Sequence, residues 1–336
     1  MIAVVTGASG FVGQNLVRRL RRDGHEVRCL VRPSGGGSPA GGTRHVVRFE
    51  EPASLLQCDA LEGAHVVFHL AAATKAPGAA AFHAANVTPT RHLLGAIIAR
   101  RLFPRFVFVS SQAAAGPAPD LHRKVNESDP PRPVEPYGRS KLEAERIVES
   151  FADRVPITVV RPSAVFGPHD RDFLPLFRFA ARGFIPYPGI AEHWFSVMHV
   201  DDLVGALIAA GTRPAAISQT YFVAGVEAMR WRDFGDHIAA AAGRPVRHLD
   251  LPLAIVQTAA LAGELWSRLS RRATLANRSK AMLSRQKYWV CSASRAREEL
   301  ALGEPRSLPH AIRDTYYWYR QSGWLRDSSG ARGAVA

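Results

Sequence analysis

A tyrosine and a lysine four residues apart have the types and the spacing of a catalytic pair. Tyr137 and Lys141 lie in the stretch EPYGRSKLEAE, which predicts a helix, and on a helix such positions share one face. A nearby ammonium group lowers the pKa of a tyrosine from its usual value of about 10. Tyr137 would then be a general acid or base near neutral pH. Because isolated pairs of this kind are common on protein surfaces, a third group is needed.

Ser111 is a candidate for that third group. It ends the apolar stretch RFVFVSS, residues 105–111, which predicts a buried strand. Open α/β sheets bind ligands at the carboxyl ends of their strands, and a hydroxyl group there can polarise a substrate carbonyl. We therefore expect Ser111, Tyr137 and Lys141 to act on a carbonyl or an alcohol.

A glycine-rich turn predicts the cofactor site. The stretch TGASGFVG places Gly7, Gly10 and Gly13 between a predicted strand at 2–6 and a predicted helix at 11–22. Bare backbone lets a pyrophosphate approach, and the helix N-terminus offers free N–H groups and a positive dipole. This context favours dinucleotide binding over a purely structural turn.

The elements that must position these residues alternate between strand and helix along the first half of the chain. Near-continuous apolar strands separated by helices indicate a doubly wound parallel sheet of the Rossmann type. The expected domain division is residues 1–162 for the dinucleotide-binding domain, 163–325 for a smaller lobe and 326–336 for a disordered tail. Further predicted strands cover 26–31, 45–49, 65–72 and 157–162, and predicted helices cover 82–101 and 137–151.

The second half is predicted to be a mostly helical substrate lobe interleaved with the last sheet strands. Its predicted helices cover 202–210, 231–242, 252–269 and 309–321, and its predicted short strands cover 221–224 and 246–249. The apolar stretch 251–266 favours core packing, with a lid over an apolar pocket or contact with a membrane surface as alternatives.

Composition excludes several classes of protein. The net charge is +14, from 43 basic and 29 acidic residues, but the arginines are spread out and no basic motif interleaved with aromatic residues indicates nucleic acid as a partner. No apolar run approaches the roughly 20 residues of a transmembrane helix, and the first residues do not resemble a signal peptide. Cys29, Cys58 and Cys291 lack CxxC spacing and the histidines lack ligand spacing, so we expect a reduced, cytoplasmic protein without a metal site.

The motifs TGASGFVG, HLAAA, FVSS and YGRSK, in this order, resemble the extended short-chain dehydrogenase/reductase family of NAD-dependent epimerase/dehydratase-like proteins. RPSAVFGP and MHVDDLV extend the similarity over residues 1–325, and the nearest-looking branches are dihydroflavonol-reductase-like and 3-beta-hydroxysteroid-dehydrogenase-like. The resemblance implies a Ser111–Tyr137–Lys141 catalytic set, in which Gly116 identifies Ser111 rather than Ser110. It also implies a homodimer through the helix of Tyr137 and the long helix before it.

The resemblance further implies cofactor contacts along the chain. Tyr137 would transfer the proton and Lys141 would bind the nicotinamide ribose. Asn86, His199, Asp201 and Asp202 match family positions for which we expect structural functions, chiefly helix capping at the last three, and Lys75 is a weaker candidate for the active site. The remaining expected contacts are Gly7, Ser9, Gly10, Phe11, Val12 and Gly13 near the pyrophosphate, Leu70, Ala71 and Ala72 beside the adenosine ribose, and Pro162 and Ser163 beside the nicotinamide.

The sequence departs from the family at the end of the second strand. An acid there would bind a ribose 2′-hydroxyl group, but the position is Arg32, which can pair with a 2′-phosphate. Arg48, where the family often has an aspartate near the adenine, would add a second cation. We therefore expect NADP(H), with NAD(H) and a merely solvated Arg32 as the alternatives.

The substrate side departs as well. Phe195 stands where nucleotide-sugar members often carry an arginine for the diphosphate, and small residues occupy 114–116. These changes favour an NADP(H)-dependent ketone reductase or secondary alcohol dehydrogenase acting on a hydrophobic or polycyclic small molecule. The alternatives are a nucleotide-sugar epimerase or dehydratase that retains NAD, and a non-catalytic cofactor-binding regulator.

Overall fold

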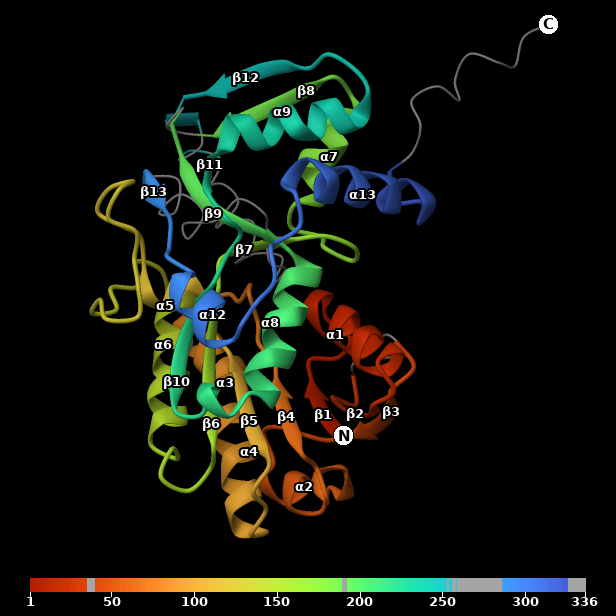
Figure 1. Cartoon of the computed structure of the whole chain (residues 1–336), viewed down its shortest axis with the longest axis vertical. Helices are drawn as coiled ribbons and strands as arrows, with labels where there is room; N and C mark the ends of the chain where they lie inside the picture. Colours follow the sequence, from red (N-terminus) through yellow and green to blue (C-terminus); the bar gives the residue numbers. More distant parts are fainter. Residues whose placement is uncertain (35–39, 189–191, 253, 256–257, 259–285, 326–336) are drawn as a thin grey trace, which may run out of the picture.

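A seven-stranded sheet forms the larger part of the chain (Figure 1). The computed structural model describes residues 1–34, 40–188, 192–252, 254–255, 258 and 286–325. All neighbouring strands of the sheet are parallel, in the order β10-β6-β5-β4-β1-β2-β3, and the predicted Rossmann-like sheet is confirmed. Its strands are β1 (Ile2–Thr6), β2 (Glu26–Val31), β3 (Thr43–Val46), β4 (Val66–His69), β5 (Arg105–Val109), β6 (Ile157–Pro162) and β10 (Gln219–Val223).

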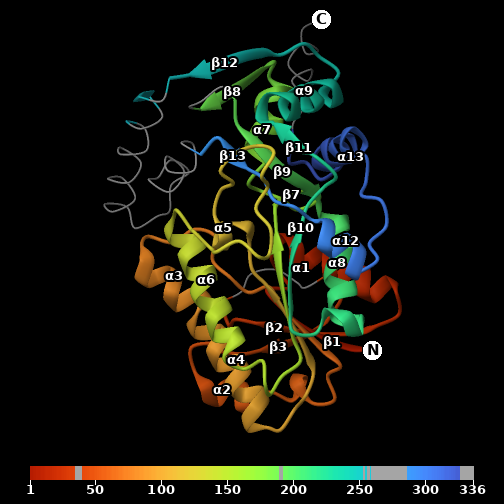
Figure 2. The same ribbon diagram turned by 60° about the vertical axis from the view of Figure 1, so that its left-hand side comes forward.

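Helices cover both faces of this sheet, because successive strand residues point to opposite sides. Val5 packs with α1 (Phe11–Arg22) and α8 (Val200–Thr212) in one core. Val4 packs with α4 (Thr88–Ala99) and α6 (Pro136–Glu149) in the other core. Figure 2 shows these two pairs of helices on opposite sides of the strands. The shorter elements of this domain are α2 (Pro52–Leu56), η1 (Asp59–Leu61), α3 (Ala79–Asn86), α5 (Gln112–Ala115) and η2 (Pro214–Ala216).

The single helix expected over 82–101 is two helices, α3 and α4, which meet at Val87. Pro89 lies in the first turn of α4. Proline has no N–H group and its ring clashes with the preceding turn, so it is tolerated at the start of a helix but not inside one. Pro89 therefore divides the segment that the apolar periodicity had joined.

The lobe contains more strand than expected. β7 (Ala164–Phe166), β9 (Trp194–His199), β11 (Ala228–Arg230) and β13 (Tyr288–Trp289) form one sheet, and β8 (Phe184–Pro188) pairs with β12 (Arg247–Leu251). Helical residues still outnumber strand residues in the lobe, as expected, but the sequence did not predict its two small sheets, because most of these short strands pair with partners far away in the sequence. Its helices are α7 (Leu174–Ala181), α9 (Trp231–Ala242), α12 (Ser294–Glu299) and α13 (Leu308–Gln321).

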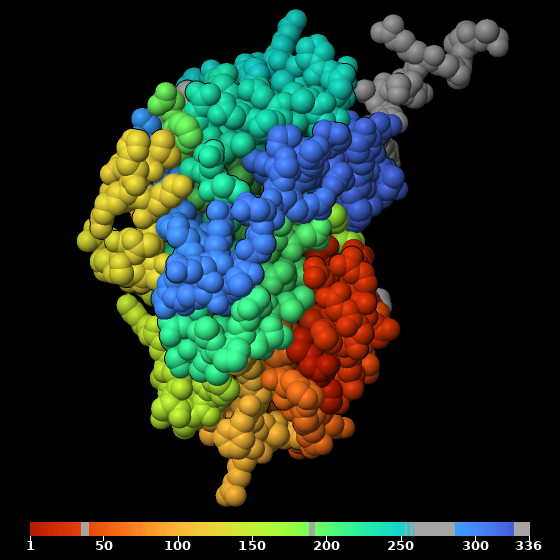
Figure 3. All heavy atoms as spheres, in the orientation of Figure 1, coloured from red at the N-terminus to blue at the C-terminus, as the bar shows by residue number. Residues whose placement is uncertain are grey.

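The lobe rests on the carboxyl end of the large sheet. Figure 3 shows the surface of α13, in blue, above that of α1, in red. The last strand of the large sheet, β10, and the helix α8 come from the second half of the chain. Most of the predicted helix 252–269 and the predicted tail 326–336 lie outside the described residues. Among the described residues, no helix has the length and apolar character needed to cross a membrane.

Candidate active site

The turn after β1 has a backbone that only glycine accommodates at two positions. Gly7 has a φ of +68°, and a Cβ atom added to it would lie 2.8 Å from the backbone nitrogen of Ala71. A Cβ atom on Gly13 would lie 2.1 Å from the carbonyl oxygen of Gly7. The N–H group of Gly10 donates to that same oxygen at 2.9 Å. Any larger residue at Gly7 or Gly13 would therefore open the turn.

The start of α1 fits an anionic group. Gly10 is the N-cap residue, and no side chain of the described chain caps this terminus. The first N–H groups of a helix have no partner within the helix, and they combine with the helix dipole to attract phosphate. The turn and the helix together fit the pyrophosphate of a dinucleotide.

A cleft of about 260 Å³ opens at the carboxyl ends of β1, β2 and β4. Phe11, Val12, Gly13, Pro162 and Ser163 are not among the residues that line it, and their contacts remain predictions. The expected cofactor residues that do line it are Gly7, Ser9, Gly10, Arg32, Leu70, Ala71 and Ala72.

The adenine end of the cleft differs from the expectation at one residue. Arg32 is exposed and lines the cleft, as expected. Arg48 does not line it, and its guanidinium group lies 3.5 Å from the carboxylate of Glu51. Phe49, with 4% of its surface exposed, and Glu50, which is exposed, line the cleft instead. The expected second cation is therefore replaced by a carboxylate.

Buried hydrogen bonds hold the loop after β4. The Oγ1 atom of Thr6 accepts from the N–H groups of Leu70 and Ala71 at 3.1 and 3.0 Å, and it lies 2.8 Å from Nδ1 of His69. The Asn86 side chain accepts from the N–H group of Ala73 at 2.7 Å and donates to the carbonyl oxygen of Ala73 at 3.1 Å. Asn86 therefore has the structural function that was expected.

Close packing of two helices brings Ser111 to Tyr137. Ser111 is the N-cap residue of α5, and Gly116 ends that helix with a φ of +92°. A Cβ atom on Gly138, in the first turn of α6, would lie 2.2 Å from the carbonyl oxygen of Ala113. With α5 and α6 this close, the Ser111 side chain lies near enough to Tyr137 to lower the pKa of its phenol.

The environment of Tyr137 does not lower its pKa. Burial raises the pKa of Tyr137 to about 12, the nearby Ser111 hydroxyl group lowers it, and the carboxylates of Glu135 and Asp172 raise it. The expectation that the Lys141 ammonium group brings this pKa toward neutrality is therefore wrong for this structure. With a pKa raised in this way, the Tyr137 hydroxyl group carries its proton at neutral pH.

Lys141 is buried beneath the site, with 1% of its surface exposed. Its Nζ atom donates to the carbonyl oxygen of Val109 at 2.7 Å and lies 4.3 Å from the centre of the Phe108 ring. Burial lowers the pKa of Lys141 to about 8, and the negative charge of Glu145 raises it.

Glu145 is a residue that the sequence analysis missed. Its two carboxylate oxygens accept from Arg161 on β6 at 3.0 and 2.7 Å, and both side chains are almost fully buried. Tyr137, Lys141 and Glu145 stand at successive intervals of four, so the spacing that identified the first two also predicts a shared helix face for the third.

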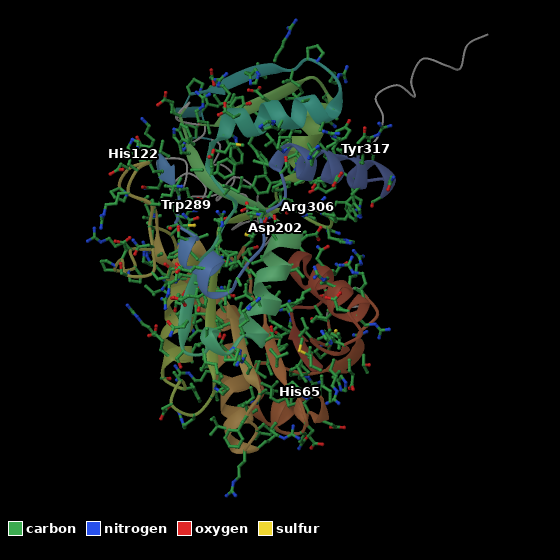
Figure 4. The ribbon with its side chains drawn as sticks, in the orientation of Figure 1. His65, His122, Asp202, Trp289, Arg306 and Tyr317 are labelled. Carbon is green, nitrogen blue, oxygen red and sulfur yellow. The ribbon has the colours of Figure 1, made fainter. Side chains whose placement is uncertain are left out.

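The HVDD segment caps α8, as expected. His199 is the N-cap residue, and its Nδ1 atom accepts from the N–H group of Asp201 at 3.2 Å. Arg306 donates to Asp201 at 2.8 Å and its backbone N–H group approaches Asp202, which ties the segment before α13 to the start of α8 (Figure 4).

The lobe side of the site is apolar at the position that the family often gives to an arginine. Phe195 has 5% of its surface exposed, and its ring centre lies 5.0 Å from that of Trp231 and 5.6 Å from that of Phe234. A side chain packed in this way offers no charge to a diphosphate. Within the described ranges, no cluster of three or more His, Cys, Asp or Glu side chains could hold a metal ion.

Comparisons with known proteins agree with this geometry. The model of the NAD dependent epimerase/dehydratase family matches residues 3–225. The chain is 28% identical over 328 residues to a ceramide reductase of Caulobacter vibrioides, covering 96% of each chain. It is 32% identical over 279 residues to a 4-hydroxy-2-methyl-3-oxo-4-farnesyl-3,4-dihydroquinoline-1-oxide ketoreductase of Stigmatella aurantiaca, covering 80% of this chain and 82% of the relative.

A solved structure shows the same fold. MoeE5 in complex with UDP-glucose and NAD aligns with a TM-score of 0.74 at 24% identity, covering 96% of this chain and 99% of MoeE5. The family match spans the glycine turn, Ser111, Tyr137 and Lys141. The chain therefore belongs to the NAD-dependent epimerase/dehydratase family of extended short-chain dehydrogenases/reductases and is an NAD(P)-dependent enzyme of the oxidoreductase type.

Proposed function

We propose that this chain is an NADP(H)-dependent ketone reductase, or secondary alcohol dehydrogenase, that acts on a hydrophobic or polycyclic small molecule. The observation that carries the proposal is the placement of Ser111, which follows β5 and caps α5, beside the helix that presents Tyr137 and the buried Lys141 four residues apart. A hydroxyl pair at this place suits a carbonyl oxygen, and the glycine-lined cleft at the same edge of the sheet suits a dinucleotide.

Each residue has a distinct task in the reduction. When bound, the nicotinamide supplies the hydride at its C4 atom. Ser111 positions the carbonyl oxygen, and Tyr137 donates its proton to that oxygen as the negative charge develops. The raised pKa of Tyr137 keeps this proton in place at neutral pH. Lys141 would hold the nicotinamide ribose without transferring a proton itself, and Pro162 and Ser163 would lie beside the nicotinamide.

Arg32 supports the choice of NADP(H). It stands at the end of β2, lines the cleft and is exposed, so its guanidinium group is available to pair with a 2′-phosphate. Glu50 lines the same cleft and would oppose a phosphate placed beside it. NAD(H) is the alternative if Glu50 rather than Arg32 meets the adenosine ribose.

The apolar position of Phe195 supports an uncharged substrate, because the packed ring leaves no cation for a diphosphate. Two relatives carry names of reductases with long apolar substrates, a ceramide and a farnesylated quinoline oxide. A nucleotide-sugar epimerase or dehydratase that retains NAD is the alternative, but Gln112 and Ala113 follow Ser111 where the dehydratase branch often carries an acidic pair.

We further infer a homodimer through α4 and α6 and a cytoplasmic setting. The family resemblance supports the dimer, and the three cysteines, which are free and buried, support a reducing compartment. Light scattering of the purified chain tests the dimer, since a monomer at micromolar concentration would contradict it.

A substrate screen tests the proposed function. The purified chain is mixed with NADPH and either hydrophobic ketones or nucleotide sugars, and the loss of NADPH absorbance is followed. We expect depletion only with ketones, and Tyr137→Phe should lower the rate by about 10²- to 10⁴-fold while leaving NADPH binding intact. Conversion of a nucleotide sugar without net NADPH loss, or full activity of Tyr137→Phe, would contradict the proposal.

A further inference from the structure

Exposed arginines lie on one face of the molecule, where α1 meets α13. Figure 3 shows these two helices one above the other on this face. Arg18, Arg21 and Arg22 are exposed on α1, and spacings of three and four residues place them on one side of the helix. The helix dipole favours cations in the last turn, which accounts for Arg21 and Arg22 but not for Arg18, one turn earlier.

A chain of contacts joins α1 to the end of α13. Arg18 donates through Nη1 to Nε2 of His169, and the His169 ring packs edge-on against Trp318 with 4.5 Å between ring centres. The Trp318 and Trp324 ring centres are 5.2 Å apart. The guanidinium group of Arg171 lies 5.2 Å from the centre of the Trp324 ring. Cationic and aromatic side chains therefore form one continuous cluster between the two helices.

Helix α13 adds an aromatic ring on its outer side. Tyr317 has 51% of its surface exposed (Figure 4). Arg313 and Arg320, four residues before it and three after it, are exposed on the same side of the helix, whereas Ile312 and Tyr319 are buried on the other side. Tyrosine, tryptophan and arginine are residues that proteins place at the interface between lipid and water.

The carboxylates near this face are paired with cations, so the face keeps an excess of positive charge. The pairs are Asp23 with Arg19 and Arg22, Asp172 with Lys75, and Asp314 with Arg306. Within the part of the chain that the structure describes, no salt bridge neutralises Arg18, Arg21, Arg171 or Arg313. The net charge of the chain, +14, has the same sign, and the face would attract an anionic surface.

A groove of about 390 Å³ lies between α1 and α8 on this face. Its lining residues are Asn15, Arg18, Arg19, Arg22, Asp201 and Val204. The Asp201 carboxylate already accepts from Arg306 at 2.8 Å. Three guanidinium groups along one groove suit the phosphate of a lipid headgroup, since guanidinium groups form charge-assisted hydrogen bonds with phosphate.

We propose that this arginine face, made of Arg18, Arg21, Arg22, Arg171, Tyr317, Trp318 and Trp324, docks on the surface of an anionic phospholipid bilayer. The arginines would meet lipid phosphates, and the aromatic rings would lie at the level of the headgroups. The inference goes beyond the proposed function, because it requires neither the reduction nor a particular substrate.

The packing of the rings favours a lipid surface over nucleic acid. Single-stranded nucleic acid binds by stacking its bases on free aromatic faces. The Trp324 ring is stacked on Tyr319, with 14° between the ring planes, and Arg171 lies over the Trp324 ring as well. Trp324 therefore has neighbours where a base would stack, whereas a bilayer requires only charge and amphipathic ring edges.

Flotation with vesicles tests the proposal on the full chain. The probes are vesicles of phosphatidylcholine alone and vesicles with about 30% phosphatidylglycerol. We expect binding only with phosphatidylglycerol, and weaker binding as sodium chloride rises. Arg21→Gln with Arg22→Gln should lower the partition coefficient about 25-fold, about fivefold for each arginine. Tyr317→Ser should lower it by about threefold at every salt concentration.

The matched control is Arg101→Gln with Arg123→Gln, which removes the same charge from exposed positions outside the arginine face. Arg123 follows His122, and Figure 4 shows His122 and Tyr317 on opposite sides of the molecule. The control variant should bind the vesicles nearly as well as the unmodified protein. Equal losses in the two double variants, equal binding to both kinds of vesicle, or no binding at all would overturn the proposal. Circular dichroism shows that each variant is folded.

Two further probes distinguish the lipid surface from other anions. Glycerol 3-phosphate should release the protein from vesicles no more than sodium chloride of the same ionic strength, and a specific release would replace the bilayer by a soluble phosphate. Labelled DNA should bind more weakly than the vesicles. Tighter binding of DNA that is lost in the Arg21 and Arg22 variant would replace the bilayer by nucleic acid. Either result would overturn the proposal.

Turnover of a ketone in solution separates this proposal from the reductase. Arg21→Gln with Arg22→Gln should reduce the ketone with NADPH at the rate of the unmodified protein, because neither residue belongs to the active site. Docking on vesicles without turnover on any ketone would uphold the arginine face and refute the reductase. Turnover without docking would uphold the reductase and refute the arginine face.

Discussion

The glycine turn after β1 and the helix α6 stand at the same edge of the sheet but are built differently. The turn works through backbone atoms, since Gly7 and Gly13 leave no room for a Cβ atom. Helix α6 works through side chains, since Lys141 and Glu145 are almost fully buried and depend on nearby charges. In the glycine turn, the size of a side chain therefore decides which residues are tolerated. In α6, the charges of the neighbouring side chains decide it.

The largest expected effect comes from breaking the buried pair on the catalytic side. Glu145→Ala leaves Arg161 uncompensated inside the protein, and we expect the free energy of unfolding to fall by about 3–5 kcal/mol in urea titrations. The paired replacement Glu145→Leu with Arg161→Met should recover most of this loss. A loss below about 1 kcal/mol in Glu145→Ala would contradict the view that α6 depends on buried charge.

A smaller effect concerns the pH dependence of stability. Because burial lowers the pKa of Lys141 from 10.5 to about 8, the unfolded chain binds this proton more tightly than the native one. Stability due to Lys141 therefore rises as the pH rises from 8 to 10.5. Lys141→Met should be more stable than the unmodified protein by about 2–3 kcal/mol at pH 7, and this gain should shrink toward pH 10.

Lys287→Met serves as the matched control, because Lys287 is exposed and pairs with Glu192. Its stability difference from the unmodified protein should stay flat between pH 7 and 10. A difference for Lys141→Met that is also flat would show that Lys141 is no harder to charge in the native protein than in the unfolded one.

In the glycine turn, we expect stability and NADPH binding to depend on the volume of the introduced side chain and not on pH. The Cβ atom of Gly13→Ala would meet the Gly7 carbonyl oxygen at 2.1 Å, so we expect a loss of about 1–3 kcal/mol of stability and at least tenfold weaker NADPH binding. Both effects should be independent of pH between 6 and 9. Gly95→Ala, on α4 with open space around it, should leave binding unchanged, and equal losses at the two positions would remove the distinction between the two sides.

The sequence predicted the bounds of those strands and helices that depend on neighbouring residues in the chain. The bounds of β1, β2, β6 and α1 agree with those expected, because apolar runs and helical periodicity are properties of neighbouring residues. The break at Pro89 was missed, since apolar periodicity continues through it, although a proline in a predicted helix is itself a signal. In the lobe, β8 pairs with β12 across more than sixty residues, and no local pattern reports such a pairing.

The sequence predicted where several site residues lie in the fold. It did not predict the charges and pKa shifts around them. Gly7 lines the cleft at the carboxyl edge of the sheet, Ser111 follows β5 and Tyr137 lies in the first turn of α6, at the places in the fold that the sequence predicted for them. The direction of the Tyr137 pKa was missed, because burial and the carboxylate of Asp172 come from packing that the sequence does not show. The presence of Glu50 rather than Arg48 in the cleft was missed as well, because the sequence does not show which side chains of the segment after β3 reach the cleft.

Fluorescence titration with NADPH and NADH tests the proposed preference for NADP(H). We predict NADPH binding at least tenfold tighter than NADH binding, with the difference erased in Arg32→Ala and left in place in Arg28→Ala, whose side chain pairs with Glu26 instead. Equal affinities for NADPH and NADH in the unmodified protein, or a preference that survives Arg32→Ala, would contradict it.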